Sequence, residues 1–137
     1  MKYRVLKNLE TGNTPLQGTG AWTSFEEATV KGQAPGKGLY FPESIPGFDK
    51  LLFSEIEKYT MEEIAFIVMK PYVGGLIPDK KLLQIVRDTV NFPMPLVKVD
   101  DSVFSLELFH GPTLAFKDVG ARFMSRCLGY FVKNQQK

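Results

Sequence analysis

The sequence predicts a mixed α/β fold. A small helix-rich domain with short strands is expected over residues 1–92, and the beginning of an α/β domain over residues 93–137. Polar capping patterns and apolar residues at helical spacing recur through the first part. Prolines at positions 93 and 95 then favour an extended linker and disfavour helix. Two strand-like segments and one more helical pattern follow this linker.

The first 41 residues predict short strands on either side of one helix. Residues 3–6 are expected to form a short edge strand, and the polar stretch 10–20 is rich in turn-forming residues. Ser24, with a glutamate three residues later, has the capping-box pattern of a helix start. Gly32 and a nearby proline predict the end of that helix, and residues 38–41 predict another short strand.

Helical signals resume after the second strand. The first signal starts at Pro46, and the next helix is expected to begin after Thr60, where Glu63 completes a second capping-box pattern. Pro71 is expected to limit or bend the end of that helix, and Asp79 is a candidate cap for a third one. The apolar positions of the third helix are Leu82, Leu83, Ile85, Val86 and Val90.

The C-terminal part predicts a pair of strands and a helix. Residues 96–99 and 103–109 are expected to form two strands around a turn at 100–102. A helix is expected from Asp118 onward, with Val119, Phe123, Leu128 and Phe131 among its apolar positions.

Composition narrows the possible functions. The chain has 137 residues, of which 44% are hydrophobic and 23% charged, as in an ordinary soluble domain with a real core. The formal charge of +2 comes from scattered basic residues, so nucleic-acid binding has little support. No apolar segment follows the N-terminus, and the longest apolar run, residues 64–69, is too short to span a bilayer.

The single cysteine, Cys127, excludes an internal disulfide and a cysteine metal site within this sequence. A reducing cytoplasm is the natural setting for such a chain. Cys127 is interpreted as a small buried apolar residue of the last helix, with a reactive thiol as the alternative.

Lys117 is the principal candidate for chemistry. Gly111 and Pro112 break the preceding strand, and apolar residues precede Lys117 before the helix begins. Loss of hydration lowers the pKa of an amine, and a neutral amine condenses with carbonyls to form a Schiff base. On local context alone, a solvated surface lysine remains the alternative.

Residues 107–120, ELFHGPTLAFKDVG, resemble the signature of the bacterial and fungal branch of the threonine synthase family. Residues 24–28 and 34–43 resemble the N-terminal signature of the same family. In the second signature the chain has Gly-Lys-Gly at residues 36–38, where the usual family pattern reads Asp-Gly-Gly. The likeness therefore covers two separate blocks with a changed turn in one of them.

The resemblance implies a pyridoxal 5'-phosphate enzyme of fold type II. It implies that Lys117 is the Schiff-base lysine and that Thr113 and Phe116 lie near the cofactor. The implied reaction converts O-phospho-L-homoserine and water into L-threonine and phosphate. It implies no metal.

Other residues of the motif have structural alternatives. His110 is a possible general base, but a structural imidazole that bonds the turn backbone is favoured. Thr113 either approaches the cofactor or pins the turn through its hydroxyl. Asp118 is expected to favour the positive end of the following helix, and Arg122 to pair with Asp118 at helical spacing.

Proteins of the family that the chain resembles are much longer than this chain. The chain itself contains no glycine-rich phosphate loop. The sequence is therefore expected to be an inactive N-terminal portion of a lyase. The alternative is a non-catalytic relative that acts as a binding or interaction module. Exposed apolar faces around the last helix suggest self-association.

Overall fold

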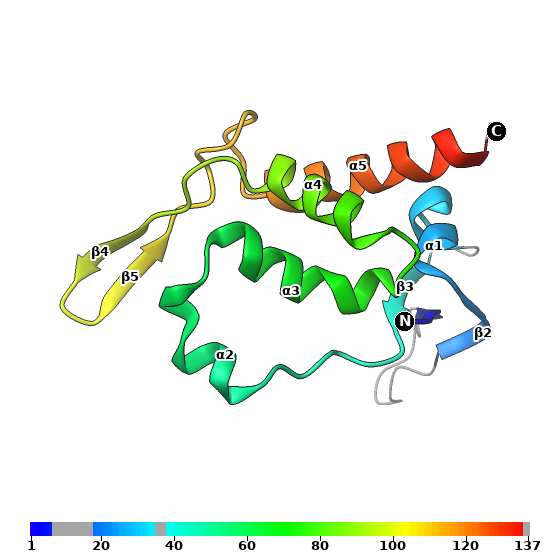
Figure 1. The fold of residues 1–137 in the computed structure, drawn as a ribbon, viewed down its shortest axis with the longest axis horizontal. Coiled ribbons are helices and arrows are strands. Elements are labelled where there is room, and N and C mark those ends of the chain that lie inside the picture. The colour runs from blue at the N-terminus through cyan, green and yellow to red at the C-terminus, as the bar shows by residue number, and fades with distance from the viewer. Residues whose placement is uncertain (7–17, 35–37, 136–137) are drawn as a thin grey trace.

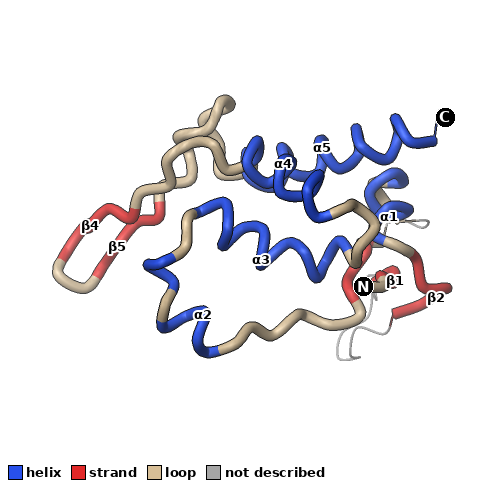
Figure 2. Tube along the Cα trace, viewed as in Figure 1, coloured by secondary structure: helices blue, strands red, loops and turns tan. Residues whose placement is uncertain are grey.

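The computed structural model describes residues 1–6, 18–34 and 38–135. A small sheet with one helix lies at one end of the molecule, and a two-stranded hairpin projects from the other (Figure 1). The longer helices lie between them (Figure 2). This is the mixed α/β architecture that the sequence predicts.

The N-terminal sheet has the strand order β2-β1-β3. Strand β1 (Tyr3–Leu6) pairs antiparallel with both β2 (Gly18–Thr23) and β3 (Leu39–Pro42). The strand predicted at residues 3–6 is therefore confirmed, but it is central and not at an edge. The predicted turn-rich stretch gives way to β2 at residue 18, and its residues 10–17 lie outside the described part of the chain.

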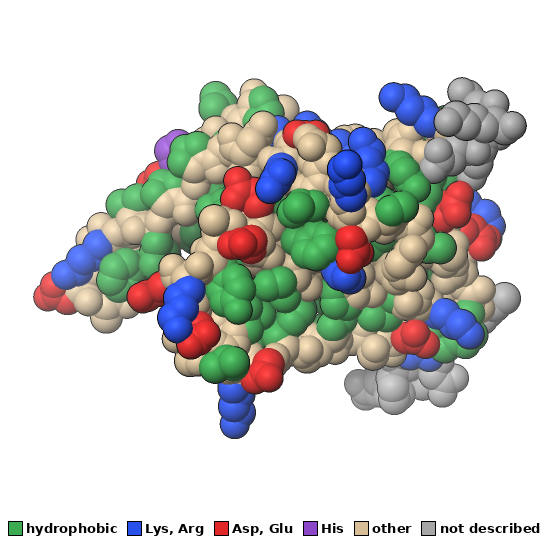
Figure 3. Space-filling model, in the orientation of Figure 1, with side chains coloured by type: hydrophobic (Ala, Val, Ile, Leu, Met, Phe, Trp, Pro, Cys, Tyr) green, Lys and Arg blue, Asp and Glu red, His purple; other side chains and the backbone are tan. Residues whose placement is uncertain are grey.

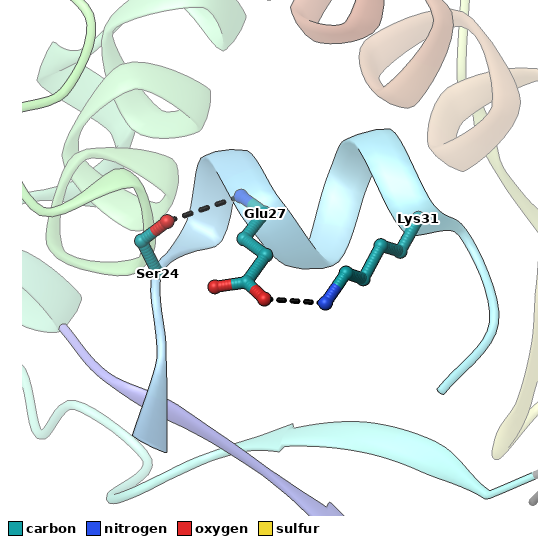
Figure 4. A network of polar contacts seen from close by, with 3 residues as sticks. All are labelled: Ser24, Glu27 and Lys31. Atoms are coloured by element: carbon teal, nitrogen blue, oxygen red, sulfur yellow. Dashed lines mark hydrogen bonds and ion pairs between the residues drawn. The ribbon is translucent and has the colours of Figure 1, made fainter. Parts of the chain in front are cut away.

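Helix α1 (Phe25–Lys31) has the start and the end that the sequence predicts. Ser24 Oγ accepts a hydrogen bond from the Glu27 amide at 3.0 Å, and Gly32 ends the helix with φ of 68°. The Glu27 carboxylate does not return the capping-box bond; it pairs with Lys31 at 2.5 Å instead (Figure 4). Half of the predicted box is thus present.

The chain from residue 46 becomes helical later than predicted. It has no regular structure until α2 (Lys50–Ser54), whose start is capped by the Asp49 carboxylate on the Leu51 amide at 2.9 Å. A 3₁₀ turn (Ile56–Lys58) separates α2 from the next helix. The proline at 46 therefore precedes an irregular segment, and the side-chain cap decides where the helix begins.

Helix α3 (Met61–Val73) begins with the complete capping box predicted for it. Thr60 Oγ1 accepts from the Glu63 amide at 3.3 Å, and the Glu63 carboxylate accepts from the Thr60 amide at 2.8 Å. Pro71 lies inside α3 without ending it, and the helix ends at Gly74 in the left-handed conformation.

Helix α4 (Asp79–Thr89) starts one residue earlier than predicted, because Asp79, the expected cap, is already helical. Pro78 occupies the cap position without a side-chain bond, and Asp79 is the first helical residue. The Asp79 carboxylate pairs with Lys70 of α3 at 2.5 Å. Asp79 therefore ties two helices together and leaves α4 without the predicted side-chain cap.

The core forms where α4 meets α3 and α5 (Asp118–Gln135). Phe25 of α1 packs against this core, with its ring 6.5 Å from Phe123 and 6.1 Å from Phe131. The buried cluster consists of Val73, Ile77, Leu82, Ile85, Val86, Phe123, Cys127 and Phe131. Helix α5 is therefore anchored from two sides.

Cys127 is fully buried in that core. Burial raises the pKa of its thiol to about 12, so the reactive thiolate is disfavoured at neutral pH. The interpretation of Cys127 as a small core residue is confirmed.

Strands β4 (Leu96–Asp100) and β5 (Val103–Leu106) form the projecting antiparallel hairpin. Every residue in both strands is exposed. The two predicted strands are confirmed, although the second ends at residue 106 and not at 109. Among the described residues, no helix combines the length and the apolar character needed to cross a membrane.

We expect Leu82→Ala to lower the free energy of unfolding by about 2–5 kcal/mol, because Leu82 is 1% exposed in the core. Leu83→Ala is the matched control. Leu83 is only half-buried, so this variant should lose less than about 1.5 kcal/mol of the free energy of unfolding. Urea denaturation measures both variants, and equal losses would contradict this assignment of the core face.

Candidate functional site

The candidate site lies in the loop that joins β5 to α5. Asp118, the first residue of α5, accepts two hydrogen bonds from Thr113. Its carboxylate receives the Thr113 amide at 2.9 Å and the Thr113 hydroxyl at 2.6 Å. These bonds close the loop over the start of the helix. The Thr113 hydroxyl therefore pins the turn, one of the two roles open to it from the sequence.

The Thr113 hydroxyl and amide also hold the pKa of the Asp118 carboxyl below its usual value, with a further contribution from the positive charge of Arg122. Asp118 is only 3% exposed. A buried carboxylate with two donors is a stable anion at the positive end of a helix. Asp118 therefore has the structural role that the sequence predicts.

The loop is compact at two other positions. A side chain at Gly111 would collide with the Asp118 carboxylate, so only glycine fits there without a shift. Leu114 adopts the left-handed conformation with φ of 57°, which non-glycine residues rarely do. Its amide donates to the Gly111 carbonyl at 3.0 Å, which holds it in that conformation.

Lys117 immediately precedes α5, and its backbone is part of the first helical turn. The Lys117 carbonyl accepts from the Ala121 amide at 2.8 Å, so the helix fixes the position from which the side chain leaves. The Lys117 side chain is exposed and makes no ion pair with any described residue. Its amine is therefore open to a ligand.

The surroundings of Lys117 differ from the expectation of a poorly hydrated pocket. Leu114 is 76% and Phe116 67% exposed, so the apolar neighbours in sequence do not enclose the lysine. In the loop between β5 and α5, both side chains therefore face solvent. Within the described residues, Lys117 lies on an exposed surface rich in apolar groups.

Arg122 has a different partner from the one predicted. Its guanidinium donates to the Asp88 carbonyl and to Asn91 Oδ1, each at 2.6 Å. It also lies 5.4 Å from the centre of the Phe92 ring. Arg122 therefore fastens the first turns of α5 to the end of α4. No local pattern in the sequence points to partners more than 30 residues away.

His110 bonds a side chain, not the turn backbone as favoured from the sequence. Its Nε2 lies 2.7 Å from Glu107 Oε2. The Phe109 ring lies 4.7 Å from the imidazole ring. The only local signal for this pair is the spacing of three residues between Glu107 and His110. The described residues hold no cluster of acidic, histidine and cysteine side chains able to bind a metal ion.

The Lys117 amine is suited to react with an aldehyde. A primary amine that is accessible, unpaired among the described residues and held by a helix start can condense with a carbonyl group. The adjoining Phe116 offers an apolar face to an aromatic ligand. The residues described here therefore fit the aldehyde end of pyridoxal phosphate.

The family described as "Threonine synthase N terminus" matches residues 17–90. Over 105 residues, the chain is 39% identical to threonine synthase from Escherichia coli and 38% identical to that from Haemophilus influenzae. Each alignment covers 77% of this chain and 24% of the relative. The chain thus spans about a quarter of the length of these curated relatives.

Solved structures agree with the sequence matches. A crystal structure of threonine synthase from Escherichia coli has a TM-score of 0.82 and 34% identity, covering 96% of this chain and 28% of that one. A structure described as PLP-bound threonine synthase from Brucella melitensis has a TM-score of 0.85 and 32% identity. It covers all of this chain and 28% of that one.

We expect Asp118→Asn to destabilise the fold at neutral pH, because one acceptor oxygen becomes an NH2 group, which removes one of the two Thr113 bonds and the negative charge. The folded-state pKa of Asp118 lies below the unfolded value. The ionised carboxylate therefore stabilises the fold above about pH 4 and loses this effect as the pH falls through the folded-state pKa.

Urea denaturation of the wild type and Asp118→Asn at several pH values measures this difference. The difference in the free energy of unfolding between the two proteins should have its full size at pH 7 and become smaller below about pH 4. Asp101→Asn, at the fully exposed Asp101 side chain of the hairpin turn, is the control and should change little. A wild-type advantage that grows as the pH falls would contradict the assignment.

Proposed function

Because the chain belongs to the threonine synthase N-terminal family, we propose that it contributes the Schiff-base lysine of a pyridoxal-phosphate lyase. That lysine is Lys117. The observation that carries the proposal is its accessible amine at the start of α5, in a loop shaped by Asp118. The match of the whole chain to a PLP-bound threonine synthase supports it.

The proposed reaction converts O-phospho-L-homoserine and water into L-threonine and phosphate. Bound pyridoxal phosphate would supply the electron sink for loss of a proton and of the phosphate. The residues of this chain would hold the cofactor and move a proton. As a free amine, Lys117 would accept or return a proton at its Nζ atom.

Thr113 and Phe116 complete the proposed cofactor site in different ways. Both Thr113 groups are bonded to Asp118, so Thr113 acts by holding the loop that carries Lys117. Phe116 is exposed beside the lysine and would contact the cofactor ring and exclude water from it. His110, bonded to Glu107, is not assigned a proton-transfer role.

We also propose the division into residues 1–92 and residues 93–137, the second belonging to a cofactor domain of fold type II, with a cytoplasmic location. The hairpin and the loop before α5 leave the helical core together, which supports a separate role for this part (Figure 1). Helix α5 nevertheless packs on α1 and α4, so the two parts share one core.

In a protein that carries this chain at the full length of its relatives, borohydride reduction should leave pyridoxal phosphate covalently attached to Lys117. Peptide mass mapping locates the label. Lys117→Ala should lose both the label and the visible absorbance, whereas the control Lys50→Ala, an exposed lysine of α2, should keep them. A label on another lysine would contradict the proposal.

The 137-residue chain alone should form no threonine from O-phospho-L-homoserine, because it spans only about a quarter of the relatives. A coupled assay for phosphate release measures this, with Lys117→Ala as the blank. Turnover above that blank would show that the chain is sufficient for the chemistry.

We further expect the isolated chain to self-associate. The exposed apolar groups gather on the hairpin, where Val99 is 66% and Phe104 53% exposed, more than on α5 itself. Light scattering over a range of concentrations should show an increasing mass, and Val99→Lys with Phe104→Lys should restore the monomer. A wild-type monomer at high concentration would contradict this expectation.

A further inference from the structure

A groove lies between α4 and α5, away from the candidate site. Its volume is about 420 Å³. Helix α4 contributes Lys81 and Asp88 to its lining, and α5 contributes Arg126, Gly129, Tyr130 and Lys133. Gly129 lies twelve residues after Lys117, which is about 18 Å along a helix axis. The groove is therefore separate from the surface that carries the lysine.

The groove has an excess of positive charge. Lys81, Arg126 and Lys133 form no ion pair with any residue that the structure describes. The one acidic side chain, Asp88, accepts a hydrogen bond from the Gln84 amide at 2.9 Å. Three cations against one carboxylate leave two positive charges uncompensated. Figure 3 shows several basic side chains over α4 and α5.

The arrangement of donors in the groove suits an oxyanion. Arg126 Nη1 donates to the Arg122 carbonyl at 3.2 Å, which aligns the guanidinium along α5. A guanidinium has five N–H donors, so others stay available. Tyr130 also lines the groove, as do one lysine from each helix, Lys81 of α4 and Lys133 of α5. Their side chains carry one neutral hydroxyl donor and two ammonium groups. Unpaired cations in a concave surface concentrate the field that attracts anions.

Gly129 keeps the groove open. A Cβ atom added at this position would meet no protein atom within 4 Å, so the space beside Gly129 is open. Gly129 also lines the groove. Within a helix, glycine costs about 1 kcal/mol relative to alanine, so nothing in the local packing of α5 favours it.

We propose that this groove binds a small phosphate-bearing anion. A phosphomonoester carries close to two negative charges at neutral pH and three acceptor oxygens. It therefore matches the two uncompensated charges, which a single carboxylate would not. Apolar ligands are disfavoured because they would leave the cations desolvated and unpaired. The proposal rests on the groove alone and does not depend on the role of Lys117.

Inorganic phosphate is the probe, titrated at constant ionic strength into the ¹⁵N-labelled 137-residue chain that carries Val99→Lys and Phe104→Lys, two changes outside the groove that are expected to keep it monomeric. Amide shifts should saturate and centre on α4 and α5 around Lys81 and Gly129. Acetate at the same ionic strength should give no saturable shift there. Arg126→Gln should weaken phosphate binding about tenfold, the effect of losing one charge-assisted hydrogen bond.

Gly129→Glu tests the groove without removing any of its cations. A Cβ atom at this position meets no protein atom within 4 Å, so the longer side chain has room to bring its carboxylate to the cations of the groove. It should abolish saturable binding while the fold is kept. Gly120→Glu is the matched control, because it adds the same charge to the same helix outside the groove, at a position where an added Cβ atom also meets nothing within 4 Å. It should leave phosphate binding within about twofold of the wild type.

Three results would overturn the proposal: shifts that never saturate, shifts centred away from α4 and α5, or equal binding by Gly129→Glu and the wild type. Saturable binding of acetate as tight as that of phosphate would overturn the preference for a dianion. Spectra that are unchanged outside the groove establish that each variant is folded.

Discussion

The pair of hydrogen bonds from Thr113 to the Asp118 carboxylate is the interaction on which the candidate site depends. It joins the loop after the hairpin to the first residue of α5, and it leaves no space for a side chain at Gly111. Because a carboxylate at a helix start also interacts favourably with the helix dipole, one group ends the loop and begins the helix. Lys117 lies at this junction, immediately before the first residue of α5.

That arrangement is useful only if α5 itself is held in place. Arg122 fastens its first turns to the end of α4, while Phe123, Cys127 and Phe131 bury its inner face. Residues of α1, α3 and α4 complete the same core. A side chain that leaves from the start of such a helix has a well-defined origin, which is what positioning a reactive amine requires.

The exposure of Lys117 separates two parts of the chemistry. Access and a fixed backbone are present within the described residues, whereas the apolar neighbours Leu114 and Phe116 remain open to solvent. The nucleophilicity of a lysine depends on its hydration as well as on its position. The exposed apolar surface around it is a physical basis for covering by a ligand or by further protein.

The sequence by itself determined the local features of this protein. The caps at Ser24 and Thr60 and the helix end at Gly32 follow from contacts within a few residues, where pattern and geometry coincide. The lysine of the motif and the family likeness were equally readable. Two predicted helix starts failed: α2 begins after its cap Asp49 and not at Pro46, and α4 begins after Pro78, which makes no side-chain bond.

The tertiary structure decided what joins distant residues. It placed β1 between two strands and left Lys117 on the surface. It also gave Arg122 of α5 its hydrogen-bond partners Asp88 and Asn91, at the end of α4 and just after it. It also brought Lys81 and Arg126 to one groove. Such pairings depend on how helices and strands pack across the molecule, and side-chain spacing along one element carries no information about its neighbour.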